Sequence, residues 1–247
     1  MWQAENLALV ALTFLAAGFV KGVVGLGLPT IVLGVLTTTY GITPAIALML
    51  VPSLVTNAIQ GLSGRSALAV ARRLWPLLLT AALGIVVGAG VLAKSSGKGP
   101  AVALGLLIVL HGAISLLGPK LPEPGRHEAW LSPVIGLANG LITGFTGSSI
   151  LPAMLYIQAL GLDKERLVQA MGLIFGVSTA VLIAAFARYE LLTPRLASLS
   201  ALALIPAILG LVLGARLRQR IAEDRFRRLL FIVLIALGAA IVWRNVG

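Results

Sequence analysis

The stretch Lys21-Gly-Val-Val-Gly-Leu-Gly-Leu-Pro29 decides the expected fold, because its glycines and its lysine interrupt the first hydrophobic segment. The chain repeats this device at Asn139-Gly-Leu-Ile-Thr-Gly-Phe-Thr-Gly-Ser-Ser-Ile-Leu-Pro152. Interrupted segments at corresponding positions in the two halves of a membrane protein indicate the substrate site of a transporter. The lysine beside the first interruption indicates that this substrate carries negative charge.

The composition is that of a membrane protein. The 247 residues are 59% hydrophobic and 11% charged, with a mean hydropathy of +1.03, whereas about 25% of the residues of a soluble domain are charged. Several runs approach or exceed the roughly 20 apolar residues that cross a bilayer. They are residues 42–62, 74–93, 100–117, 167–187, 196–215 and 229–243. We therefore expect an all-α polytopic membrane protein.

Small residues align the two halves of the chain. Gly18, Gly22 and Gly25 correspond to Gly140, Gly144 and Gly147, and the pair Gly84/Gly88 corresponds to Gly210/Gly214. We expect the two latter pairs to be close-packing positions between helices. The alignment predicts two repeats, 1–120 and 121–247, within a single membrane domain. Each repeat is expected to hold a broken or re-entrant pair of short helices followed by three full transmembrane spans.

The net charge of +11 comes from basic residues that gather at the ends of the apolar runs. This placement indicates orientation in a membrane and affinity for anionic lipids, and no binding of nucleic acid. If each broken pair enters and returns, thirteen basic residues fall on one side and five on the other. The thirteen, Arg65 and Lys120 among them, mark the cytoplasmic side of the inner membrane and place both termini in the periplasm. The repeats then have an odd number of segments and are inverted.

The interruptions are suited to binding an anion. Glycines let the chain leave the helix, and Pro29 suits the first turn of a new one. In the second half we expect Ser148 and Ser149 to cap the helix that follows. A helix N-terminus presents free N–H groups and partial positive charge. Two such ends, brought from opposite faces by inverted repeats, are expected to meet near the membrane midplane.

Lys21 is the sharpest single candidate. All eight Asp and Glu residues lie at segment ends or in loops. A buried ammonium is therefore stabilised by an anionic ligand or by losing its proton. Two alternatives stay open, namely that Lys21 extends to a membrane interface or that it pairs with backbone carbonyls.

The candidate substrate-binding residues share a place in or beside an interruption, or a polar side chain at membrane depth. They are Lys21, Gly22, Gly25, Gly27, Thr30, Asn57, Asn139, Gly144, Thr146, Gly147, Ser148 and Ser149. We take Asn139 as the counterpart of Lys21 in the second half. His111 is interpreted either as a proton carrier or as a neutral histidine bonded between helices. We expect no catalytic residues, no metal site and no cofactor, and the chain has no cysteine.

These motifs resemble the sulfite exporter TauE/SafE family, also called the toluene-sulfonate uptake permease family. The second half carries the resemblance most clearly, from Gly136 to Pro152 and on through Gly161-Leu-Asp-Lys-Glu-Arg-Leu-Val-Gln-Ala170. The first interruption departs from the family's usual run of consecutive glycines by offering Gly25-Leu-Gly27. The resemblance implies transport of sulfite, sulfonates or other organic anions.

The sequence thus predicts a secondary transporter of a small, sulfur-containing anion that works by alternating access. An anion channel is the first alternative, and a membrane enzyme acting on a lipid phosphate is the second. Import and export are both compatible with these features, as is coupling to a proton or to a sodium ion. The expected partners are the substrate and membrane lipids, and a homodimer is left open.

Overall fold

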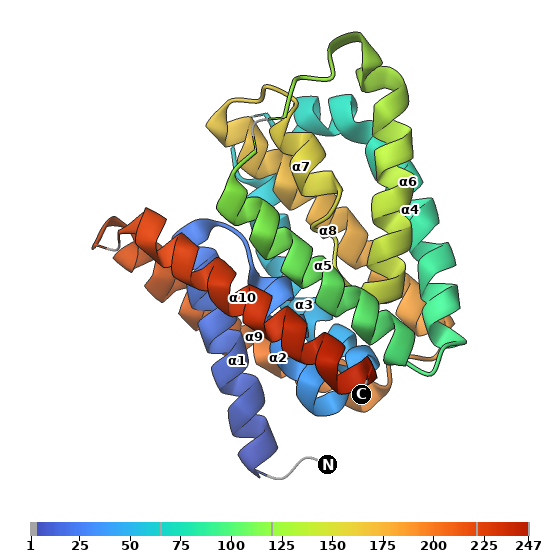
Figure 1. Cartoon of the computed structure of the whole chain (residues 1–247), viewed down its shortest axis with the longest axis vertical. Coiled ribbons are helices and arrows are strands. Elements are labelled where there is room, and N and C mark those ends of the chain that lie inside the picture. Colours follow the sequence, from blue (N-terminus) through green and yellow to red (C-terminus); the bar gives the residue numbers. More distant parts are fainter. Residues whose placement is uncertain (1–3, 65, 120, 221, 247) are drawn as a thin grey trace. The chain divides into compact units, whose positions relative to one another are not determined.

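The chain folds into two compact units that interleave in the sequence. The computed structural model describes residues 4–64, 66–119, 121–220 and 222–246 (Figure 1). One unit comprises Met1–Pro52, Gly97–Leu117 and Thr193–Gly247, and the other Ser53–Ser96 and Gly118–Leu192. These units differ from the sequence halves 1–120 and 121–247, so the repeat stays a prediction. Arg65, Lys120 and both chain ends lie outside the described residues.

Every regular element of the described residues is a helix, which confirms the all-α class. The α-helices in chain order are α1 Ala4–Val24, α2 Leu28–Tyr40, α3 Ile42–Leu62, α4 Ala67–Ala93, α5 Lys98–Leu117, α6 Glu128–Thr146, α7 Ala153–Gln158, α8 Lys164–Arg188, α9 Pro194–Leu217 and α10 Glu223–Val246. Short 3₁₀ turns, η1 Gly125–His127 and η2 Arg218–Arg220, lead into α6 and follow α9.

Eight helices of the described chain are long and apolar enough to cross a membrane, which leaves α2 and α7 as the short ones. The expectation of two short helices in each broken pair is therefore wrong for the first member. Helix α1 has 21 residues and α6 has 19, against 13 in α2 and 6 in α7. Gly22 and Gly144 do not end these helices, because both lie inside them.

Each broken pair is a hairpin whose second arm returns to the start of the first. Tyr40, at the end of α2, donates its hydroxyl to Oδ1 of Asn6 at 3.1 Å. Tyr156, on α7, donates to the backbone carbonyl of Glu128 at 3.4 Å. Because Asn6 and Glu128 lie in the first turns of α1 and α6, each tyrosine closes the mouth of its hairpin.

Glycines seat each hairpin on one long helix of the same unit. In the first unit α1 packs on α9, and a Cβ on Gly18 or Gly22 would meet the backbone of Ala207 or of Leu211 and Gly214. In the second unit α6 packs on α4, as Figure 1 shows. Here Gly140 faces the backbone of Ala81.

Glycines on the supporting helices α9 and α4 also lie in these two helix–helix contacts, which we call the seams. Gly210 and Gly214 on α9 meet the backbone of Leu15 and Phe19, and Gly84 and Gly88 on α4 meet that of α6. The prediction that these two glycine pairs are close-packing positions is thus confirmed. With no side chain between them the helix backbones approach closely, so each hairpin rests on a rigid support.

Within each unit hydrogen bonds join the ends of neighbouring helices. In the second unit Gln60, near the end of α3, donates to the carbonyl of Val168 near the start of α8 at 3.4 Å. At the opposite end Tyr189, just after α8, donates to the carbonyl of Val86 on α4 at 3.4 Å. In the first unit Arg244, near the end of α10, donates to the carbonyl of Thr38 on α2. The assignment of these ends to cytoplasm and periplasm stays a prediction.

Candidate functional site

The first break is short and consists of Gly25, Leu26 and Gly27. The amide of Gly25 donates to the carbonyl of Lys21 at 2.7 Å and completes the last turn of α1. Gly25 and Gly27 have φ values of 87° and 105°, in the left-handed region that favours glycine. Helix α2 then begins with Pro29 in its first turn, as predicted, and without a side-chain cap. Its first N–H groups therefore stay open to an anion.

Lys21 lies in the last turn of α1, directly before this break. Its side chain is only 4% exposed, so protein atoms cover it and it does not extend to the surface of the chain. This burial argues against the alternative that Lys21 reaches a membrane interface. Lys21 thus lies one helical turn before a break that leads into a helix start without a side-chain cap, and a lysine and a helix start both favour negative charge.

Thr30 supplies a hydroxyl in the first turn of α2. The residue is 1% exposed, and its Oγ1 has no hydrogen-bond partner among the residues that the structure describes. Buried hydroxyls are nearly always hydrogen-bonded, because an unpaired one loses its interactions with water. The Thr30 hydroxyl is thus available to a ligand at the first break.

The second break runs from Gly147 to Pro152 and is held by hydroxyl groups. Thr146 donates its hydroxyl to the carbonyl of Ile142 at 2.7 Å and accepts from the amide of Ser148 at 3.2 Å. Gly147, with φ 77°, ends α6 in the left-handed conformation. The chain is therefore tied back to α6 where it leaves the helix, while Ser149 stays half-buried in the break.

The cap of the second short helix differs from the prediction. We expected Ser148 and Ser149 to cap it, but α7 begins only at Ala153, too far along the chain for either serine. Oδ1 of Asn139 accepts from the amide of Ala153 at 3.3 Å instead. Asn139 is completely buried, and its Nδ2 has no hydrogen-bond partner within the described part of the chain. One end of this amide thus fixes α7 and the other offers a donor.

The helix seams show which residue corresponds to Lys21 in the second hairpin. Lys21 precedes Gly22, which faces Gly214, and Thr143 precedes Gly144, which faces Gly88. The structural counterpart of Lys21 is therefore Thr143 and not Asn139. The Thr143 hydroxyl donates to the carbonyls of Asn139 at 2.7 Å and of Ser148 at 3.3 Å. Thr143 is not among the candidates predicted from the sequence, although the spacing of the glycines carries this signal.

The remaining candidates lie inside helices. Gly22 and Gly144 face helix backbones, so their observed contact is packing, and their role toward a ligand stays a prediction. Asn57, on α3, is buried with its Cβ toward Gly176 of α8. His111 packs edge-on against Phe231 at 5.6 Å, and its Nδ1 lies 3.4 Å from the Ser115 hydroxyl. No group of three potential metal ligands occurs among the described side chains.

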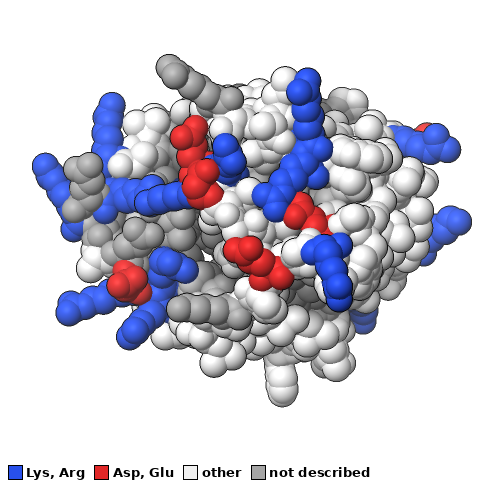
Figure 2. All heavy atoms as spheres, turned by 90° about the horizontal axis from the view of Figure 1, so that it is seen from above, with Lys and Arg blue, Asp and Glu red and all other residues white. Residues whose placement is uncertain are grey.

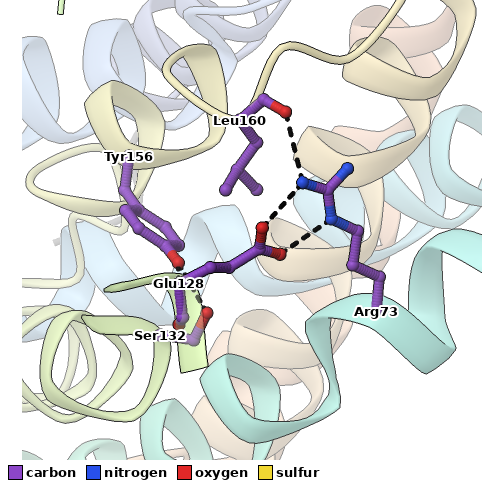
Figure 3. Close-up of polar contacts among 5 residues, drawn as sticks. All are labelled: Arg73, Glu128, Ser132, Tyr156 and Leu160. Atoms are coloured by element: carbon purple, nitrogen blue, oxygen red, sulfur yellow. Dashed lines mark hydrogen bonds and ion pairs between the residues drawn. The ribbon is translucent and has the colours of Figure 1, made fainter. Parts of the chain in front are cut away.

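An ion-pair network anchors the second hairpin at its mouth (Figure 3). Arg73 on α4 contacts both carboxylate oxygens of Glu128, at 2.7 and 2.8 Å, and donates to the carbonyl of Leu160 at 3.3 Å. Tyr156 lies 2.6 Å from the hydroxyl of Ser132. The network joins α4, the start of α6, Tyr156 within α7 and Leu160 just after it, so it fixes the arm that leads out of the second break.

Comparison with known proteins identifies the family. Residues 10–241 match the family described as "Sulfite exporter TauE/SafE". The chain belongs to the sulfite exporter TauE/SafE family. A relative from Cupriavidus necator, named "Probable sulfite/organosulfonate exporter TauE", is 30% identical over 237 residues, which cover 92% of this chain and 90% of the relative. No solved structure matches this chain.

Membership in the sulfite exporter TauE/SafE family confirms the resemblance read from the glycine motifs. It also identifies the chain as a membrane transporter, in agreement with eight helices able to span a bilayer. The match runs through both hairpins, so the two breaks and the residues around them lie within the region typical of the family.

Proposed function

We propose that the protein is a secondary transporter that moves a small anion with a sulfite or sulfonate group across the inner membrane by alternating access. Membership in a family of sulfite exporters supports the substrate class, as does the name of the Cupriavidus necator relative, an exporter of sulfite or organosulfonate. Inverted repeats, each beginning with one hairpin, are the architecture that gives alternating access around a fixed site.

The observation that carries this proposal is the buried Lys21 beside the uncapped start of α2. Sulfite and sulfonates present several negatively charged oxygens at one centre. A lysine ammonium carries donors only, and the first amides of a helix are donors as well. Thr30 adds a hydroxyl that is free to donate. The first break thus combines positive charge with donors, which is what an oxyanion requires.

The second break contributes neutral groups. Nδ2 of Asn139 is a buried donor, and Ser149 lies half-buried within the break. Such groups orient a ligand without neutralising its charge. We therefore assign recognition of the negative charge to the first hairpin.

We also propose an orientation with the thirteen-residue basic side in the cytoplasm and both termini in the periplasm. Single cysteines introduced into this cysteine-free chain test it directly. A cysteine at Lys98 should react with an impermeant maleimide added outside intact spheroplasts, and a cysteine at Arg126 should react only after lysis. The reverse pattern would contradict the orientation.

Counterflow in proteoliposomes tests the transport mechanism. Vesicles loaded with unlabelled sulfite or taurine should accumulate the labelled anion transiently, because a carrier exchanges one substrate for another. Lys21→Ala should abolish accumulation and Lys21→Arg should retain part of it. Lys98→Ala, which removes an exposed lysine of the same unit, should leave it unchanged. Uptake that is indifferent to the internal substrate would indicate a channel and contradict the proposal.

A further inference from the structure

A polar pocket lies within the first unit, where the end of α5 meets the first turns of α10. Its volume is about 290 Å³, the room of roughly ten liquid water molecules. The lining residues are Ser115, Leu116, Asp224, Arg227, Arg228 and Phe231. The residues proposed for transport do not line it, so it is a separate feature of the molecule.

An aromatic floor orients one of the two arginines. The guanidinium carbon of Arg227 lies 6.0 Å from the ring centroid of Phe231, within the range of a cation–π contact. Phe231 is itself buried and packs edge-on against His111 of α5. Arg227 is therefore held toward the pocket through contacts that reach into the helix pair.

The charges in the pocket are of both signs. Arg227 and Arg228 form no ion pair with any described carboxylate, and the exposed Asp224 lies one helical turn before them. Two guanidinium groups match the oxygens of a phosphate. The carboxylate of Asp224 does not suit the phosphate, but it accepts a hydrogen bond from an amine or hydroxyl beside it.

The surroundings of the pocket are those of a membrane surface. Leu117, Leu229 and Ile232 are exposed apolar side chains on the same two helices. Basic residues recur through the connector from Arg216 to Arg228, and Figure 2 shows Lys and Arg side chains crowding the left of the face in view. Basic pockets between helices at the cytoplasmic surface are typical sites for phospholipid headgroups.

We propose that this pocket binds a phosphate ester that carries an amine or hydroxyl donor, the headgroup chemistry of phosphatidylethanolamine and phosphatidylglycerol. The phosphate binds to Arg227 and Arg228, the donor group binds to Asp224, and Ser115 lines the same space. The exposed leucines beside the pocket receive the acyl chains. Phosphatidylcholine offers the phosphate without such a donor and binds less well.

Native mass spectrometry of the full chain in detergent tests this, with the three lipids matched in their acyl chains. Phosphatidylethanolamine and phosphatidylglycerol should remain bound at lower concentrations than phosphatidylcholine. Arg227→Gln and Arg228→Gln should each weaken binding about fivefold. Arg225→Gln, which removes an exposed arginine of the same helix outside the pocket lining, should change binding far less.

Asp224→Ala, which removes the acceptor, separates the two parts of the proposal. It should keep phosphate binding while removing the preference for phosphatidylethanolamine over phosphatidylcholine. Thermal stabilisation by phosphoethanolamine or inorganic phosphate alone, lost in Arg227→Gln, would support the phosphate site and name a soluble phosphate compound as its ligand. Equal binding of all three lipids to the unmodified chain, or an equal loss in Arg225→Gln and Arg227→Gln, would overturn the proposal.

Discussion

The two broken hairpins share their support and differ in their chemistry. Both α1 and α6 rest glycine against backbone on one long helix of their own unit, and both hairpins are closed at the mouth by a tyrosine. At the first break, however, Lys21 precedes Gly22, the second glycine that packs against the supporting helix, and the helix that follows has no side-chain cap. At the second break the same position is Thr143, and Asn139 caps the next helix.

The two breaks thus differ in hydrogen bonding and in charge. The second break satisfies its own backbone through Thr143, Thr146 and Asn139, so it is a pre-formed and neutral surface. At the first break the Thr30 hydroxyl has no described partner, the start of α2 has no side-chain cap, and the buried Lys21 lies in the preceding turn of α1. The halves share a scaffold, and the charge sits in one of them.

The largest expected effect tests the shared support. Gly18→Ala and Gly140→Ala each place a methyl group against the backbone of the supporting helix. We expect each to lower the free energy of unfolding by about 3 kcal/mol, measured by thermal or denaturant unfolding in detergent. Gly99→Ala is the control, because nothing lies within 4 Å of a Cβ there. If only one of the two variants loses stability, the two hairpins are not supported in the same way.

The next largest effect is expected from removing the side chain that caps α7 in the second hairpin. Asn139→Leu leaves the buried amide of Ala153 without its acceptor, and we expect a loss of about 2 kcal/mol in the free energy of unfolding. Asn245→Leu, near the end of α10, should change stability by less than about 0.5 kcal/mol. An Asn139→Leu variant as stable as the unmodified protein would show that the cap does not hold α7.

Two threonines sharpen the difference between the breaks. Thr30→Val removes a hydroxyl with no described partner, so stability should hold while anion binding weakens about tenfold. Thr146→Val removes hydrogen bonds to Ile142 and Ser148, so the free energy of unfolding should fall by about 1 kcal/mol with less effect on binding. Calorimetric titration and thermal unfolding of both variants check this pattern. The opposite pattern would reverse the roles of the two breaks.

The smallest effects concern the mouths of the hairpins. Tyr156→Phe loses the contact at 2.6 Å to Ser132 in a buried setting, and about 1 kcal/mol of stability is expected to go with it. Tyr40→Phe loses a longer bond to Asn6 at a half-buried position, and about half that loss is expected. Equal losses in the thermal unfolding of the two variants would argue that burial does not distinguish these closures.

Local signals in the sequence predict most of the fold. The six apolar runs fall inside α3, α4, α5, α8, α9 and α10, with α3 matching to the residue. Such runs are readable because a bilayer sets the length of a span. Pro29 likewise lies where a proline suits the first turn of a helix. The seam glycines were recognised by their spacing, which reflects close approach of helices.

Contacts between residues distant in the sequence decide what local signals missed. Gly22 and Gly144 are typical of helix breaks, but each lies inside a helix and packs against the backbone of a neighbouring helix. Ser148 and Ser149 have the composition of a cap, yet Asn139, from the preceding helix, provides it. The ion pair between Arg73 and Glu128 also depends on the packing of α4 on α6. No local pattern in the sequence indicates these partners.

The most direct test of the charge at the first break is calorimetric titration of the purified protein with sulfite, taurine, aryl sulfonates and simple carboxylates. We expect a sulfur oxyanion to bind the unmodified protein and the Lys98→Ala control with equal affinity. Lys21→Ala should lose this binding by tenfold or more, as expected when a charged hydrogen-bond donor is removed. Unchanged binding of the same anion to Lys21→Ala would contradict the account and move charge recognition away from the first hairpin.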